Sequence, residues 1–305
     1  MSASTGSLSV EVSPEVGEAL AAGRAVVALE STIFSHLGLP SPSNYEALER
    51  CEQAVRNEGA VPAVTAVLDG VARVGVHGDD RERICGPARK MAERDIPVAV
   101  GLNWEYGATT VSAALALAHL AGVTVFATGG IGGVHRGVEL TWDISADLDA
   151  IATRPLVTVS AGAKAFLDLG RTLEHLETAG VPVLGWQSDD FPAFYTRSAG
   201  LPVPHRVESA DQVAAIWSAR TRADGGVLLA VPIPSEDELD AAHLDEVLAR
   251  ALDECAAAGV VGAGVTPFVL ERIATATAGR SLPANLALAE HNAMVAAQVA
   301  VAISG

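Results

Sequence analysis

Three polar or charged side chains follow apolar runs of strand length. Glu30 closes the run Ala25–Leu29, Thr128 ends a second run, and Lys164 lies just past Leu156–Ser160. Ligands of open α/β sheets bind at the carboxyl ends of strands. We therefore expect these side chains to contribute to one shared site.

Glu30 and Lys164 have the chemical types of an acid and a nucleophile. A carboxyl group at the end of a buried strand is partly desolvated, which raises its pKa and suits it to donate a proton near neutral pH. Lys164 has small or apolar neighbours, so its amine is expected to lose hydration and attack a carbonyl or anomeric carbon, forming an imine. The alternatives are a glutamate that caps a turn and a lysine that extends from an early helical turn to solvent.

The segment from Thr128 to Asp147 reads TGGIGGVHRGVELTWDISAD and contains five glycines. A backbone with few side chains lets N–H groups approach a phosphate closely, although a flexible connection would have the same composition. His135 in this segment and His36 in an earlier loop are candidate proton carriers or phosphate donors, without a specific signal.

Two carboxylates follow the glycines. Asp143 is a candidate ligand for Mg²⁺ or Mn²⁺, which prefer oxygen donors and retain several waters. Asp147 could also bind a metal, or it could lie in the first turn of a helix that Ser145 caps. Lys90 reads as a solvated helix end, and the segment that ends at Val111 could supply N–H donors at a helix start.

Composition limits the class of protein. The 305 residues are 50% hydrophobic and 4% aromatic, which is typical of a compact α/β enzyme. The net charge of −17 disfavours binding to nucleic acid or to an anionic membrane. Three widely spaced cysteines read as free thiols in a reducing compartment, and no apolar run is long enough to span a bilayer. Without a signal peptide pattern, we expect a cytoplasmic protein.

Apolar runs alternate with helical patterns along one domain over residues 1–305, of which 1–13 is expected to be a frayed tail. Helical periodicity and capping boxes predict helices over 43–57, 107–120, 163–179 and 282–303, and after Ser209 and Ser235. The remaining predicted strands are Ala63–Leu68, Val98–Val100, Val123–Ala127, Val183–Trp186 and Val227–Val231. This alternation favours a sheet covered on both faces.

A series of ordered motifs resembles the pseudouridine-5′-phosphate glycosidase family, which includes indigoidine synthase A-like proteins. The motifs are Ala28-Leu-Glu-Ser-Thr-Ile33, Gly59-Ala-Val-Pro-Ala63, Val67-Leu-Asp-Gly70, Gly107-Ala-Thr-Thr-Val111, Phe126-Ala-Thr-Gly-Gly-Ile-Gly-Gly-Val-His-Arg-Gly137, Asp143-Ile-Ser-Ala-Asp147, Ser160-Ala-Gly-Ala-Lys164, Asp190-Phe-Pro-Ala-Phe-Tyr195, Pro232-Ile-Pro234 and Thr266-Pro-Phe268. They extend over nearly the whole chain. Departures at Lys90–Asp95, Leu102–Tyr106 and Leu37–Pro40 leave the catalytic positions intact.

The resemblance implies a three-layer α/β/α fold with a mixed, mostly parallel sheet, and a homotrimer. It implies reversible cleavage of the C–C glycosidic bond of pseudouridine 5′-phosphate to uracil and ribose 5-phosphate, with one Mn²⁺ or other divalent metal per subunit. It implies that Glu30 is the proton donor, Lys164 the nucleophile and Asp143 a metal ligand. The substrate contacts that it implies are Lys90, Val111, Ser145, Ala146, Asp147 and Asn285.

The implied chemistry fits these residue types. Glu30 would protonate the ribose ring oxygen while Lys164 attacks C1′, and uracil would leave the imine-linked adduct after protonation at C5. Two alternatives stay open from the sequence. One is a related sugar-phosphate C-glycosidase that acts on another base in a pigment pathway, and the other is a noncatalytic nucleotide-binding protein.

Overall fold

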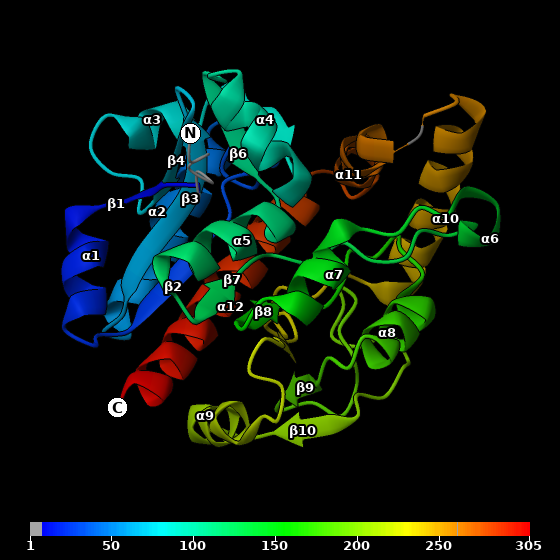
Figure 1. The fold of residues 1–305 in the computed structure, drawn as a ribbon. Helices are drawn as coiled ribbons and strands as arrows, with labels where there is room; N and C mark the ends of the chain where they lie inside the picture. The colour runs from blue at the N-terminus through cyan, green and yellow to red at the C-terminus, as the bar shows by residue number, and fades with distance from the viewer. Residues whose placement is uncertain (1–7, 261) are drawn as a thin grey trace.

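A computed structural model describes residues 8–260 and 262–305 of the chain, and its strands form one large sheet (Figure 1). The strands are β1 (Val10–Val12), β2 (Val26–Leu29), β3 (Val61–Leu68), β4 (Val71–Val74), β5 (Arg89–Met91), β6 (Tyr106–Thr109), β7 (Val125–Ala127), β8 (Val157–Ser160), β9 (Val183–Trp186), β10 (His205–Val207) and β11 (Val227–Ala230). Their order is β1-β4-β3-β2-β7-β8-β11-β9-β10, and β6 joins β3 to β5.

The sheet is mixed and mostly parallel, as predicted. Strand β3 runs antiparallel to β4 and β6, and the other pairings between these described strands are parallel. Parallel neighbours need crossover connections, which helices supply. The carboxyl ends of β2, β7 and β8 therefore meet at one edge.

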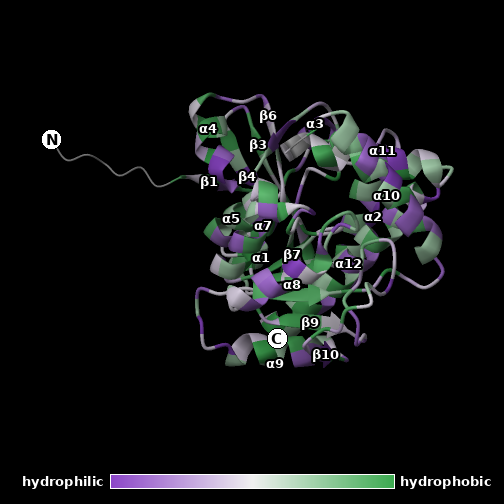
Figure 2. Ribbon diagram, turned by 90° about the vertical axis from the view of Figure 1, so that its right-hand side faces the viewer, coloured by the Kyte–Doolittle hydropathy of each residue, from purple (hydrophilic) through white to green (hydrophobic). Residues whose placement is uncertain are grey.

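Helices cover both faces of this sheet. They are α1 (Pro14–Ala21), α2 (Ser43–Asn57), α3 (Asp80–Ile84), α4 (Ile96–Gly101), α5 (Val111–Ala121), α6 (Val138–Thr141), α7 (Ala146–Thr153), α8 (Leu169–Thr178), α9 (Ala210–Ala219), α10 (Ala241–Ala257), α11 (Val265–Ala276) and α12 (Ser281–Ser304). Helices α2 and α12 pack together behind β2 and β7, whereas α5 and α7 lie on the opposite side (Figures 1 and 2). The three-layer α/β/α prediction is confirmed.

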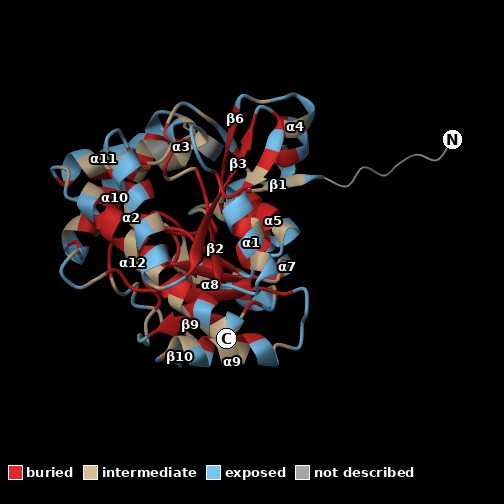
Figure 3. Ribbon diagram, turned by 90° about the vertical axis from the view of Figure 1, so that its left-hand side faces the viewer, coloured by how far each residue is buried: buried red, intermediate tan, exposed pale blue. Residues whose placement is uncertain are grey.

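The central strands are buried on both faces. Every residue of β2, β3, β7, β8 and β11 is buried, which explains their mostly apolar sequences (Figure 3). In contrast with the expectation from sequence, α12 is long and apolar enough to cross a membrane by length and composition. However, 61% of its apolar window is buried inside the protein, as in the core helix of a globular fold.

Several local predictions were wrong. Val98–Val100 belongs to α4 rather than to a strand, because Pro97 at the second position favours a helix start. The predicted helix at 107–120 begins as strand β6 and becomes helical only at Val111. No helix follows Ser235 directly, and α2 lacks a side-chain cap, whereas Ser209 caps α9 as predicted.

The N-terminal segment is more ordered than predicted. Residues 1–7 of the predicted tail lie outside the described residues. Strand β1 pairs in parallel with β4, and the Ser13 hydroxyl accepts the Val16 N–H at 3.4 Å to cap α1. The expectation of fraying is therefore wrong for residues 10–13, because sheet pairing and a helix cap fix them.

Candidate active site

A pocket of about 610 Å³ opens at the carboxyl ends of β2, β7 and β8. All the predicted site residues line it: Glu30, Lys90, Val111, Asp143, Ser145, Ala146, Asp147, Lys164 and Asn285. They come from separate strand ends, helix starts and loops. The fold thus brings the predicted set together, while the role of each residue stays a prediction.

Glu30 is the buried acid of the pocket. It follows β2 directly, and the Thr128 hydroxyl at the end of neighbouring β7 donates a hydrogen bond to its Oε1. Burial raises the pKa of Glu30 to about 6, while the charge of Lys164 and the Thr128 hydrogen bond oppose the rise. A carboxyl group with this pKa can carry a proton close to neutral pH.

Backbone pairing that continues beyond β7 and β8 positions Lys164. The Ile131 N–H donates to Gly162 O at 3.1 Å, and the Lys164 N–H donates to Ile131 O at 3.1 Å. Helix α8 begins only at Leu169, so Lys164 lies in the preceding loop and is not on an early helical turn. The lysine is half-buried, and its charge lowers the pKa of both Glu30 and Lys90.

Asp147 joins two walls of the pocket. Its Oδ1 accepts the Ser112 N–H and its Oδ2 accepts the Gly132 N–H, both at 2.9 Å. The Ser145 hydroxyl accepts the Asp147 N–H at 3.3 Å and caps α7, which confirms the predicted cap. Asp147 therefore holds the start of α5 and the start of α7 beside the glycine-rich segment.

Close packing explains the glycines of this segment. A Cβ at Gly130 would lie 2.4 Å from the Phe194 ring, and one at Gly132 would lie 2.2 Å from Ser145 Oγ. A Cβ at Gly133 would lie 2.5 Å from Thr172 Oγ1. The absence of a Cβ at these glycines leaves room for neighbouring side chains of the protein itself. The number of glycines alone therefore does not indicate a phosphate-binding loop.

His135 and Asp143 face each other across a small hairpin. The His135 N–H donates to Asp143 O at 3.0 Å, and His135 Nδ1 lies 3.8 Å from Asp143 Oδ2. Burial lowers the pKa of His135, although Asp143 opposes this change. Among the described residues, no group of three or more His, Cys, Asp or Glu side chains could enclose a metal. The half-exposed Asp143 fits a mostly hydrated hard cation rather than a closed cage.

Several groups that line the pocket are suited to bind an anion. Lys90 on β5 and Arg94 line it, together with the N-terminal ends of α5 and α7. Helix starts carry free N–H groups and a partial positive charge. Lys90 reaches solvent through the pocket mouth, yet the surrounding protein and Lys164 lower its pKa. Its placement in a strand corrects the expectation of a solvated helix end.

Apolar side chains also line the pocket, among them Ile33, Phe194 and Leu270. Asn285 at the start of α12 also lines this pocket, and its buried Oδ1 has no hydrogen-bond partner in the described residues. An unsatisfied buried acceptor is costly, so a ligand N–H is a natural partner for it.

Sequence reasoning did not find every feature of the site. The strand-end position of Thr128 predicts that it contributes to the site, but its contact with Glu30 is not predictable because the pairing of β2 with β7 is not encoded locally. Arg94 and Phe194 carried no specific signal. His36 does not line the pocket. Its Nδ1 accepts the Ala88 N–H at 3.0 Å, and this hydrogen bond links the loop that contains His36 to the segment before Lys90.

Comparisons with known proteins are consistent with this geometry. Residues 15–302 match the family model described as indigoidine synthase A like protein. A pseudouridine-5′-phosphate glycosidase of Roseiflexus sp. is 51% identical over 98% of this chain and 97% of its own length. The enzyme of the same name from Methylobacterium nodulans is 49% identical over 97% of this chain and 88% of its own length.

Two solved structures share the fold. The prealnumycin C-glycosynthase AlnA, in complex with ribulose 5-phosphate, has a TM-score of 0.90 and 39% identity, covering 98% of both chains. An indigoidine synthase A-like protein of Thermotoga maritima has a TM-score of 0.87 and 32% identity over the full length of both chains. Together with the family match and the full-length relatives, these findings show that the chain belongs to the indigoidine synthase A-like family.

Proposed function

We propose that this chain reversibly cleaves pseudouridine 5′-phosphate to uracil and ribose 5-phosphate. The observation that carries the proposal is the presence of Glu30, an acid with a raised pKa, and Lys164 in one pocket. Relatives about half identical over nearly the whole chain bear the name of this activity.

The proposed chemistry begins at the ribose ring. Lys164 Nζ attacks C1′ as the C1′–O4′ bond breaks, and Glu30 supplies the proton that O4′ takes up. The Glu30 carboxylate then removes a proton from the attached nitrogen, whose lone pair forms the C=N bond of a protonated imine as the C1′–C5 bond breaks. Glu30 delivers that proton to C5 of uracil. Water hydrolyses the imine to release ribose 5-phosphate and regenerate the Lys164 amine.

The residues that line the pocket suggest how the substrate is bound. Lys90, Val111 and the Ser145–Asp147 turn would contact the phosphate and ribose. Asn285 also lines the pocket, and its Oδ1, which has no partner among the described residues, would accept an N–H of uracil. An apolar wall with one convergent amide is a common form of base recognition.

We further propose that Asp143 holds one hydrated Mn²⁺ or similar divalent cation per subunit. Such an ion would supply positive charge and ordered waters beside the substrate. Exhaustive chelation should then lower activity, and added Mn²⁺ should restore it. Unchanged activity after verified metal removal would overturn this part of the proposal.

A synthesis assay tests the function directly. Incubation of the protein with uracil, ribose 5-phosphate and Mn²⁺ should yield the C-nucleotide, identified by chromatography and mass spectrometry. Intact-protein mass spectrometry after borohydride treatment should show a pentose-phosphate adduct on Lys164. Ligand-induced thermal stabilisation without product or adduct would favour a noncatalytic nucleotide-binding protein.

A second candidate is a C-glycosidase for the same sugar phosphate and a different base. The likeness to a C-glycosynthase that was crystallised with ribulose 5-phosphate favours it. Adduct formation with ribose 5-phosphate but no condensation with uracil would support this alternative. The expected single domain, homotrimer and cytoplasmic location remain proposals, and light scattering would test the trimer.

A further inference from the structure

Thr128 does not line the pocket, yet it is fixed on three sides beside the acid. Its N–H donates to Val159 O at 3.0 Å, which extends the pairing of β7 with β8. Its carbonyl accepts the Asn292 side-chain amide at 2.8 Å, and its hydroxyl donates to Glu30 Oε1. A threonine held in this way has little freedom to turn its hydroxyl elsewhere.

Asn292 connects this strand end to the core helix α12. It is fully buried, and its amide also lies 3.2 Å from Gly129 O. Its own Oδ1 has no partner in the part of the chain that the structure describes. An unsatisfied buried carbonyl lowers stability. The contribution of Asn292 to the fold therefore comes from the hydrogen bonds that its amide donates to the carbonyl groups of Thr128 and Gly129.

The hydroxyl contact also bears on the protonation of the carboxyl group. When the Thr128 hydroxyl donates to Oε1, the proton of the neutral acid is carried by Oε2. A hydroxyl that donates to a carboxylate stabilises the ionised form. The contact thus opposes the effect of burial and keeps the acid able to release its proton.

We propose that Thr128 is the positioning residue of the proton donor, setting the orientation and protonation of Glu30, and that Asn292 holds Thr128 in place. This inference rests on the proposed function for its catalytic consequence. Behind the residues that line the pocket, Asn292 on α12 would hold Thr128 at the end of β7, and Thr128 would hold Glu30 at the end of β2.

Isosteric variants test the inference. Thr128→Val removes the hydroxyl and should move the alkaline limb of the kcat/KM profile upward by about one pH unit, since a hydrogen bond to a charged group is lost. Thr128→Ser keeps the hydroxyl and should retain the profile of the parent protein. Thr158→Val is a matched control, because Thr158 is buried in the adjacent strand and its Oγ1 has no partner among the described residues.

Asn292→Leu gives a second readout. Loss of the amide should lower kcat about tenfold with KM within about twofold, because substrate contacts are untouched while the acid is less well aligned. Circular dichroism would confirm that the variant folds. A rise in KM with unchanged kcat would contradict a positioning role.

A titration separates this inference from the proposed function. In protein with ¹³C-labelled glutamate, the Glu30 carboxyl resonance, assigned with Glu30→Gln, should titrate about one pH unit higher in Thr128→Val. This measurement needs no turnover, so it remains decisive even if the parent protein forms no C-nucleotide. Overlapping titrations of the parent and Thr128→Val, or an equal shift in Thr128→Ser, would overturn the inference.

Discussion

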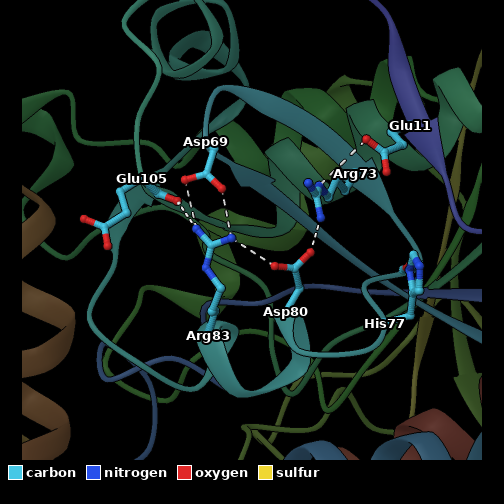
Figure 4. A network of polar contacts seen from close by, with 8 residues as sticks. Glu11, Asp69, Arg73, His77, Asp80, Arg83 and Glu105 are labelled. Carbon is cyan, nitrogen blue, oxygen red and sulfur yellow. Dashed lines mark hydrogen bonds and ion pairs between the residues drawn. The ribbon is translucent and has the colours of Figure 1, made fainter.

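Two charged regions of the molecule differ in how their charges are satisfied. In the ion-pair network around Arg83, the guanidinium contacts both Asp69 oxygens at 2.9 and 3.0 Å and Asp80 at 2.9 Å (Figure 4). A further bond reaches Glu105 O at 3.2 Å, and Arg73 binds the other Asp80 oxygen. Hydrogen bonding to Arg83 lowers the pKa of Asp69.

In the pocket, the charges lie close enough to shift one another but are poorly paired. Glu30 accepts one hydrogen bond, from Thr128, and neither Lys90 nor Lys164 makes a salt bridge among the described residues. Burial therefore dominates and raises the pKa of Glu30. Paired charges at the surface hold elements in place, whereas unpaired buried charges lower stability and become available for chemistry.

Substitution of Lys164, the proposed nucleophile, should have the greatest effect on turnover. Lys164→Ala should lower turnover by about 10⁴-fold or more and eliminate the pentose-phosphate adduct, because no amine is left to form the imine. Lys164→Arg keeps the positive charge and should be equally inactive. Single-turnover kinetics and intact mass spectrometry would measure both effects, and full activity in either variant would refute the assignment.

Glu30→Gln should separate activity from stability. Loss of the proposed proton donor should slow turnover by roughly 10²- to 10⁴-fold. Folding raises the pKa of Glu30 from 4.5 to about 6. The contribution of Glu30 to the stability of the wild-type protein is therefore fully present below pH 4.5 and is lost as the pH rises through 6. The variant should therefore be more stable by about 2 kcal/mol above pH 7, and equally stable near pH 4, in denaturant unfolding.

Asp69→Asn in the Arg83 network is the matched comparison for Glu30→Gln. It also removes one carboxylate charge, but it should lower the melting temperature slightly near pH 7 and leave turnover unchanged. If both substitutions shifted stability in the same direction, the contrast between the two regions would be wrong.

Lys90→Met should weaken binding more than chemistry. Loss of one charge-assisted contact is expected to raise KM for pseudouridine 5′-phosphate by about 10- to 100-fold. The KM of uracil in the synthetic direction should change little, because Lys90 is proposed to contact the phosphate rather than the base. Arg89→Met, one residue away on β5 and outside the pocket, serves as the control.

The smallest effect is expected in the ion-pair network. Arg83→Ala should lower the melting temperature by no more than about 2 °C, since exposed ion pairs contribute little, and kcat and KM should not change. Added salt should shrink the difference between the variant and the parent protein. A large loss of activity would show that this network supports the pocket after all.

Local patterns predicted many of the elements but not their boundaries at functional positions. The apolar runs that became β2, β7, β8 and β11 were readable, because strands buried on both faces need continuous apolar sequence. The predicted strand at Val98–Val100 and the helix at 107–120 were misassigned because short apolar segments fit either structure. The caps at Ser145 and Ser209 were correct, since capping depends on neighbouring residues only.

Residue type, local apolarity and ordered motifs were sufficient to single out Glu30, Lys164 and Asp143 as candidate site residues. Which groups contact one another depends on the fold. Thr128 reaches Glu30 because β2 lies beside β7, and Asn292 reaches Thr128 because α12 packs behind both strands. These contacts join residues more than 90 positions apart, and no local pattern encodes such pairings. The raised pKa of Glu30 likewise arises from its burial in the assembled fold.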